Sequence, residues 1–254
     1  MPDLQRSALL SFVAGFSRRQ AARTAEVPGG FAAYDPAFPH SRGNNLVVMD
    51  GEFDPLALPR TVDAALGHLS HRMVYVLDET AGEACTEPLL RAGYSRSAYV
   101  LMEHTGPVPE AAGSAAVVEL DALREALERQ WRVFLPDAGD AVIRQLVERR
   151  SVRHRGAAEV RFLASRTPQG EVAAWADLYL DPASGIAQIE ELVTAQAHLR
   201  HGHGDAVLST ALRTAADSGC GTRFLVADAQ DWPQEWYRRR GFEAVGNLAC
   251  FERA

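Results

Sequence analysis

The segment from Ile189 to Ala206 reads Ile-Glu-Glu-Leu-Val-Thr-Ala-Gln-Ala-His-Leu-Arg-His-Gly-His-Gly-Asp-Ala. It begins with the apolar pattern of a strand, crosses a short polar loop, and enters a helix through Gly202 and Gly204. The first amides of a helix have no partner within the helix, and the helix dipole places partial positive charge there. Glycine lets the backbone approach a ligand closely. This stretch therefore predicts an anion-binding site of the kind that holds phosphate groups.

The sequence around this segment predicts a mixed sheet. Short turns that contain Pro and Gly join three apolar runs, at 160–165, 172–180 and 186–194, and the last run leads into this segment. This pattern predicts an antiparallel meander. Strands and helices alternate after it, so we expect helices on both faces of the sheet. Helices are expected around 142–147, after Gly204 and after Asp121. Asp121 is a candidate N-cap of its helix. The expected strands of this half are 117–120, 160–165, 172–180, 186–194, 223–227 and 242–251, and its last helix is 233–240.

The first half of the chain has the same kind of pattern. Leu9, Phe12, Val13 and Phe16 recur at helical spacing, which predicts an amphipathic helix over the first twenty residues. Helices are expected at 59–69 and 83–91, and strands at 46–49, 73–77 and 94–102. The order helix, strand, helix, Gly-aromatic, strand at 59–102 is repeated at 205–251, which is a weak sign of duplication.

A linker is expected between the two halves. The stretch from Thr105 to Ala116 combines Pro, Gly and small residues and has no periodicity. We therefore predict an accessory domain at 1–105, a linker at 106–116 and a second domain at 117–254.

Composition excludes several classes of protein. The 254 residues are 47% hydrophobic and 23% charged, with a net charge of -7. This acidic balance argues against a nucleic-acid partner, because a phosphate backbone needs a basic surface. No apolar run is long enough to span a bilayer, and the first residues lack the pattern of a signal peptide. The three widely spaced cysteines favour reduced thiols in a cytoplasmic protein.

The second half resembles the GNAT superfamily of acyl-CoA-dependent N-acetyltransferases. The cofactor loop of that family, [Gln/Arg]-x-x-Gly-x-[Gly/Ala], is matched from Leu199 to Gly204, with Leu199 departing from its first position. A second family motif, Tyr-x-x-x-Gly-Phe, is intact from Tyr237 to Phe242. The resemblance implies an α/β (α+β) fold with a mixed, mostly antiparallel central sheet flanked by helices. The first half would be a smaller, degenerate unit in a tandem arrangement.

The resemblance also implies acetyl-CoA as co-substrate and no metal. The backbone amides of the loop would bind the pyrophosphate, the end of the preceding strand would pair with the pantetheine arm, and Gln230 would also touch that arm. Asp205 should point away from the phosphates. The residues assigned to the cofactor are Leu192, Val193, Thr194, Leu199, Arg200, His201, Gly202, His203, Gly204, Asp205 and Gln230. His198, His201 and His203 alternate, but no carboxylate or Cys completes a metal-ligand set with them.

Acetyl transfer to an amine needs a base for the amine and an acid for the departing thiolate. Tyr237 matches the acid of the family, and a phenol of ordinary pKa near ~10 suits a thiolate of similar basicity. Strand alternation places Glu190 and Glu191 on opposite faces, so only one of them faces the acceptor unless a bulge intervenes. We take Glu190 as the base and keep Glu191 as the second choice.

The acceptor is not encoded in any motif. We expect the primary amine of a small molecule, attacked directly in a ternary complex, and a monomer or homodimer. The alternative is a non-catalytic acyl-CoA-binding sensor or interaction module on the same fold. The first half lacks a Gly-rich helix entry and has Leu89 in the place of Tyr237, so we expect it to be non-catalytic. The basic run 149–155 is expected to be a solvated helix end.

Overall fold

The computed structural model describes residues 2–110 and 115–254. Its contacts divide the chain into two compact units, and the first of them combines both ends of the chain. That unit runs up to Glu103 and continues from Val226 to Ala254, while the second unit is His104–Leu225. The boundary falls within strand β10 (Thr222–Asp228).

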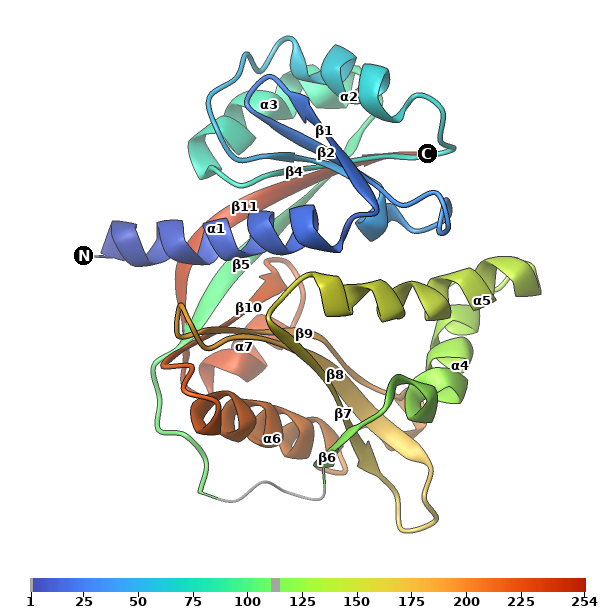
Figure 1. The fold of residues 1–254 in the computed structure, drawn as a ribbon, viewed down its shortest axis with the longest axis vertical. Helices are drawn as coiled ribbons and strands as arrows, with labels where there is room; N and C mark the ends of the chain where they lie inside the picture. The colour runs from blue at the N-terminus through green and yellow to red at the C-terminus, as the bar shows by residue number, and fades with distance from the viewer. Residues whose placement is uncertain (1, 111–114) are drawn as a thin grey trace. The chain divides into compact units, whose positions relative to one another are not determined.

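The first unit contains a sheet in the order β1-β2-β3-β4-β11-β5 (Figure 1). Strands β1, β2 and β3 pair antiparallel, β3 and β4 pair parallel, and β11 pairs antiparallel with β4. Its strands are β1 (Arg23–Val27), β2 (Gly30–Tyr34), β3 (Leu46–Met49), β4 (Arg72–Val76), β5 (Ser95–His104) and β11 (Phe242–Arg253). Its helices are α1 (Pro2–Gln20), η1 (Arg42–Asn44), α2 (Leu58–Leu66), α3 (Glu79–Arg91) and α7 (Pro233–Arg238).

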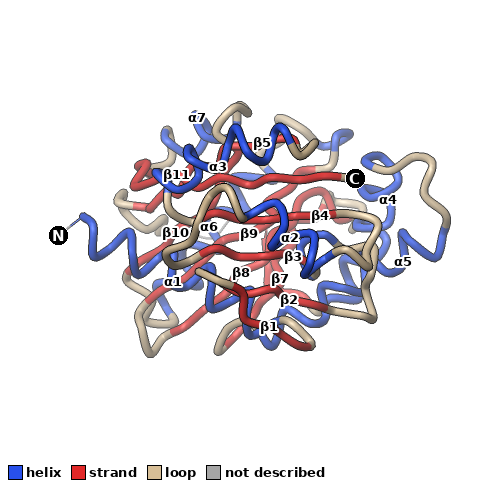
Figure 2. Tube along the Cα trace, turned by 90° about the horizontal axis from the view of Figure 1, so that it is seen from above, coloured by secondary structure: helices blue, strands red, loops and turns tan. Residues whose placement is uncertain are grey.

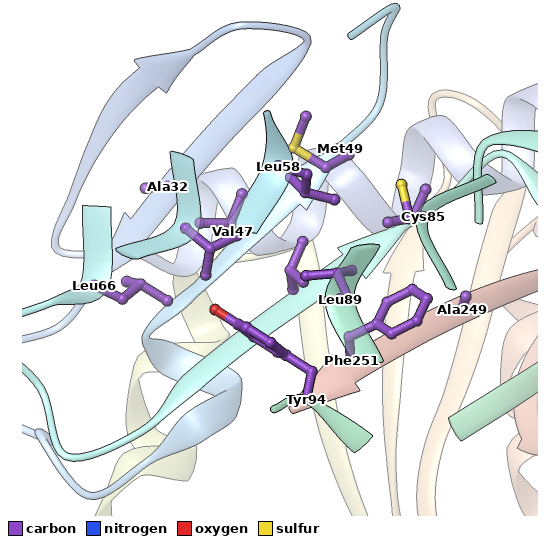
Figure 3. Close-up of a cluster of buried hydrophobic side chains, with 13 residues drawn as sticks. Ala32, Val47, Met49, Leu58, Leu66, Cys85, Leu89, Tyr94, Ala249 and Phe251 are labelled. Carbon is purple, nitrogen blue, oxygen red and sulfur yellow. The ribbon is translucent and has the colours of Figure 1, made fainter. Parts of the chain in front are cut away.

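Two apolar clusters hold the first unit together. One cluster joins α2 and α3 to the sheet through Leu58, Leu89, Tyr94 and Phe251, all with little or no exposed surface (Figure 3). The other includes Ala14 of α1, and the predicted apolar face of that helix is buried at Leu9, Phe12 and Phe16. The amphipathic pattern of the first twenty residues is therefore explained by burial of one helix face.

The second unit contains the predicted meander. Strand β9 pairs antiparallel with β8, β8 with β7, and β7 with β6, while β10 pairs parallel with β9. The strands, red in Figure 2, are β6 (Ala115–Val118), β7 (Glu159–Arg166), β8 (Val172–Asp181), β9 (Ile186–Thr194) and β10. The helices are η2 (Leu120–Leu123), α4 (Arg124–Phe134), α5 (Asp140–Glu148), η3 (Arg149–Arg155), η4 (Gln196–His198) and α6 (His203–Asp217).

Helix α6 packs against strands β6 to β9 of this unit. Val207, Leu208, Ala211, Leu212 and Ala215 are buried, as their spacing predicts. Strand β8 is buried from Val172 to Leu180, so both of its faces are covered. This mixed and mostly antiparallel arrangement, flanked by helices, is the fold class that the sequence predicts.

The repeated element order is present in the structure. Helix α3 is followed by Gly93 and α7 by Gly241, and both glycines have a left-handed backbone, with φ of 85° and 83°. Each donates its amide to a carbonyl in the last turn before it, Leu90 and Arg238 respectively. A glycine in this conformation commonly ends a helix.

The expected cap of the first helix in the second unit differs from the structure. Asp121 is not a helix cap: α4 begins at Arg124, after η2, and the Asp121 carboxylate accepts from the Arg124 guanidinium at 3.0 Å. Strand β11 adds to the sheet of the first unit, and the domain bounds 1–105 and 117–254 remain a prediction. Residues 111–114 of the predicted linker lie outside the described residues.

Candidate active site

The loop before α6 has a left-handed backbone at two positions. Gly202 is the N-cap of the helix and is left-handed, with a φ of 80°. A Cβ atom built on Gly202 would meet nothing within 4 Å, so the space beside this residue is open. Arg200 is also left-handed, with a φ of 65°, although it is not a glycine. Such conformations are disfavoured and gather at binding loops.

The amides of the first turn of α6 have no partner inside the helix, and the dipole favours negative charge in front of them. Arg200, His201 and Asp205 are exposed at this end. Leu199 is 43% exposed, so the departure from the family pattern leaves an apolar side chain at the surface of the loop. The loop therefore fits a phosphate group through backbone amides and one nearby cation.

The histidines of the loop are engaged by protein groups. His203 Nδ1 lies 2.8 Å from the buried Ser165 hydroxyl, and His198 Nε2 lies 3.3 Å from Glu171. Burial lowers the pKa of His203, and His198 and His201 lower it further. Among the described residues, no group of His, Cys, Asp or Glu side chains is placed to hold a metal ion.

A β-bulge lies in β9 directly after Glu190, where Glu191 and Leu192 oppose a single residue of β8. Asp177 pairs with Glu190 and Trp175 pairs with Val193, so β9 contains one residue more than β8 between these pairs. Glu191 has a φ of 47°, in the left-handed region. A bulge interrupts strand alternation, so the rule that puts consecutive side chains on opposite faces does not hold here.

The two glutamates have different partners. Glu190 accepts a hydrogen bond from Gln188 Nε2 at 2.7 Å and retains some exposure. Burial raises the pKa of Glu190 to about 7, and the neighbouring Glu191 adds to the rise. A carboxylate with this pKa can accept a proton near neutral pH.

Glu191 is held by three arginines. Arg149 donates to it at 2.9 Å, and Arg150 and Arg153 also donate to its two oxygens. Burial opposes ionisation, but Arg150, Arg153 and Arg149 hold the pKa of Glu191 well below its ordinary value. Glu191 is thus a permanently charged group that is already occupied by protein partners.

The arginines correct a sequence-based expectation. The run 149–155 is not a solvated helix end, because Arg149, Arg150 and Arg153 are at most 8% exposed. Arg150 and Arg153 also donate to Asp177, which is fully buried on β8. The only sequence signal of this cluster is an aspartate inside the otherwise apolar strand 172–180.

A cavity of about 440 Å³ lies beside the loop in the second unit. Its walls come from α4, β8 and the segment that follows β9. The apolar side chains in these walls are Ala126, Val133, Phe134, Trp175, Ala195, Ala197 and Leu199.

Tyr237 and Gln230 belong to the first unit. Tyr237 is 8% exposed and makes edge-to-face contacts with Trp236 and Phe242, at ring-centroid distances of 5.1 and 5.5 Å. Gln230 is exposed in the turn after β10, and its amide donates to Asp228 at 2.8 Å. Both assignments to the site remain predictions.

Comparison with known proteins finds a family model that matches part of the chain. Residues 120–242 match the model of the acetyltransferase (GNAT) family. No curated protein matches the sequence. None of the described helices has the length and hydrophobicity needed to cross a membrane.

Several solved structures share the fold over nearly the whole chain. A GCN5-related N-acetyltransferase from Kribbella flavida is 19% identical, with a TM-score of 0.62, covering 97% of this chain and 94% of its own. A conserved protein of unknown function from Staphylococcus epidermidis is 12% identical, with a TM-score of 0.65 and coverages of 90% and 92%. A GNAT-family protein described as a possible acetyltransferase, from Novosphingobium aromaticivorans, is 16% identical, with a TM-score of 0.58 and coverages of 90% and 89%.

Proposed function

Because residues 120–242 belong to the GNAT acetyltransferase family, we propose that this protein transfers an acetyl group from acetyl-CoA to the primary amine of a small molecule. The observation that carries the proposal is the open, left-handed Gly202 at the start of α6, within the segment that matches the family. The reaction would be a direct attack in a ternary complex.

The loop and β9 would hold the co-substrate. Backbone amides from Arg200 to Asp205 would bind the pyrophosphate, with Arg200 as an additional cation. The segment Leu192–Thr194 would pair with the pantetheine arm through its backbone, and Gln230 would contact the same arm. When bound, acetyl-CoA supplies an activated acyl carbon.

Glu190 would act as the base. It would accept a proton from the ammonium form of the acceptor, which frees the nitrogen lone pair to attack the acyl carbon. A carbon–nitrogen bond forms and the carbon–sulfur bond breaks; Tyr237 would give its proton to the departing sulfur, and the second proton that the nitrogen loses on becoming an amide would restore the Tyr237 phenol. Glu191, the second choice for the base, is poorly suited because three arginines hold its carboxylate.

The cavity next to the loop would receive an apolar part of the acceptor. Its volume of about 440 Å³ is within the usual range of small-molecule sites. The net charge of -7 supports a partner other than nucleic acid. We propose a cytoplasmic monomer or homodimer without a membrane partner.

The first unit would be a degenerate copy of the same fold in a tandem arrangement. The parallel pair of β3 and β4 with α2 between them has the topology of β9, α6 and β10. Helix α2 begins with Ala57 as its N-cap instead of a glycine, so this copy would not bind a phosphate in the same way.

The proposal is tested by measuring acetyl-CoA binding and thiol release in parallel over a panel of small primary amines. We expect micromolar to millimolar binding, as for ordinary substrates, and thiol release with at least one amine. Binding without turnover on every amine would favour a non-catalytic acyl-CoA-binding module, and no binding would refute the site.

A further inference from the structure

Glu190 and Glu191 are consecutive residues with different hydrogen-bond partners. Among the residues that the structure describes, the Gln188 amide is the neutral group that donates to Glu190. Glu191 has three guanidinium donors, of which Arg149 lies at 2.9 Å. One carboxylate is therefore left available to react, and the other is fully engaged.

The bulge brings the second carboxylate to the arginines. Asp177 is the register partner of Glu190, and ordinary alternation would turn Glu191 to the other face of the sheet. The extra residue and the left-handed φ of 47° turn Glu191 toward the same arginines that hold Asp177. Non-glycine residues seldom adopt this conformation unless the surroundings enforce it.

The arginines link two adjacent strands to η3. Arg150 and Arg153 are three residues apart, the spacing at which side chains of a 3₁₀-helix lie on one face. Each donates to both Asp177 and Glu191. Buried ion pairs of this kind contribute little net stability, because burial of the charges offsets their attraction. Their value here is the fixed position of the Glu191 carboxylate.

We propose that Glu191 is a positioning residue for Glu190: clamped by Arg149, Arg150 and Arg153, it fixes the backbone at the bulge and keeps a permanent negative charge beside the base. The inference rests on the proposed role of Glu190. That charge disfavours loss of the proton from Glu190, so the base gains basicity that an isolated surface glutamate lacks.

Several groups act on Glu190 besides its own burial. Glu191 on β9 and Asp177 on β8 favour its protonated form, while Arg153 on η3 and the Gln188 amide favour its ionised form. Tyr179 on β8 also interacts with Glu190, and burial raises the pKa of its phenol well above the ordinary value, so it stays neutral. Burial, followed by Glu191, is what raises the pKa of Glu190 to about 7.

The test compares Glu191→Gln with Glu191→Asp. The Glu190 carboxyl is followed by ¹³C NMR over pH, and the pH dependence of kcat/KM is measured for an amine that the protein accepts. In Glu191→Gln we expect the pKa of Glu190 and the midpoint of the acidic limb of the rate profile to fall together, by about one pH unit. In Glu191→Asp, which keeps the charge, both should stay near the wild-type position, although kcat falls.

A matched control is Glu159→Gln, which removes a surface glutamate paired with Arg161 in the same unit and should move neither curve. An unmoved Glu190 titration in Glu191→Gln would overturn the inference and leave the proposed function intact. The carboxyl titration needs no substrate, so it decides the inference even where no amine is acetylated.

A second variant covers the case in which Glu191→Gln does not fold. Arg153→Met removes the cation that favours the ionised form of Glu190 and leaves the Arg149 and Arg150 contacts with Glu191 in place. With less positive charge near the pair, the Glu190 titration should move up. A downward shift, or none, would refute the electrostatic role of the cluster.

Discussion

Replacement of Glu190 by Gln should make the protein more stable at pH 8 and change its stability little at pH 5. Burial raises the pKa of Glu190 above its ordinary value of 4.5 to about 7. A carboxyl group whose pKa is raised in the folded state stabilises the folded protein when the pH is below its unfolded-state pKa. That contribution is lost as the pH rises from about 4.5 through about 7. Gln has nearly the same shape and stays neutral throughout.

The size of the effect follows from the shift. One pKa unit corresponds to about 1.4 kcal/mol, so the rise to about 7 corresponds to about 3 kcal/mol between pH 4.5 and pH 8. Solvent reaches part of the Glu190 side chain, which weakens the effect. We therefore compare the free energies of unfolding of Glu190→Gln and the wild type. The advantage of the variant should be about 2 kcal/mol larger at pH 8 than at pH 5.

Urea unfolding at pH 5 and pH 8 measures this difference for the wild type, Glu190→Gln and the control Glu159→Gln. His203 and other groups that titrate in this range are present in all three proteins, so their contributions cancel. Equal dependence on pH in the wild type and Glu190→Gln would show that Glu190 ionises near its ordinary pKa. The assignment of Glu190 as a base tuned by burial would then fail.

Three further predictions concern the loop, the acid and the core. Tyr237→Phe should lower kcat by a factor of about 100 or more and leave acetyl-CoA affinity nearly unchanged; an undiminished rate of thiol release would exclude Tyr237 as the acid. Gly202→Glu should weaken acetyl-CoA binding by a factor of about 10 or more through charge and backbone strain, as measured by calorimetry. Gly170→Glu is its control, since Gly170 is equally left-handed, at 88°, with open space around it, and equal losses in both would contradict the loop assignment. Leu208→Ala should cost about 2–5 kcal/mol in urea unfolding, because Leu208 is 2% exposed, and a loss under about 1 kcal/mol would mean that α6 is not packed as described.

Local pattern was sufficient to predict most of the elements. The apolar spacing on α6 and the turns of the meander depend on neighbours in sequence, and both are present as expected. The hairpin of β1 and β2 was missed, because the stretch around Gly29 and Gly30 contains the glycines and prolines typical of a loop.

The site was less predictable from sequence. Alternation alone could not choose between Glu190 and Glu191, since the bulge depends on how β9 pairs with β8. The basic run around Arg150 has the composition of a surface segment, and only its contacts with Asp177 and Glu191 explain its burial. Long-range ion pairs leave almost no local signal.

The position of β11 has a consequence for biosynthesis. Its pairing with β4 puts residues that are translated after the whole second unit into a sheet whose strands β1 to β5 are translated before that unit. Until β11 has been translated, the growing chain would expose an unpaired edge at β4, which is a hazard for aggregation. Cleavage between the halves would leave the amino-terminal fragment lacking a strand, so neither piece should be expected to regain the native packing alone.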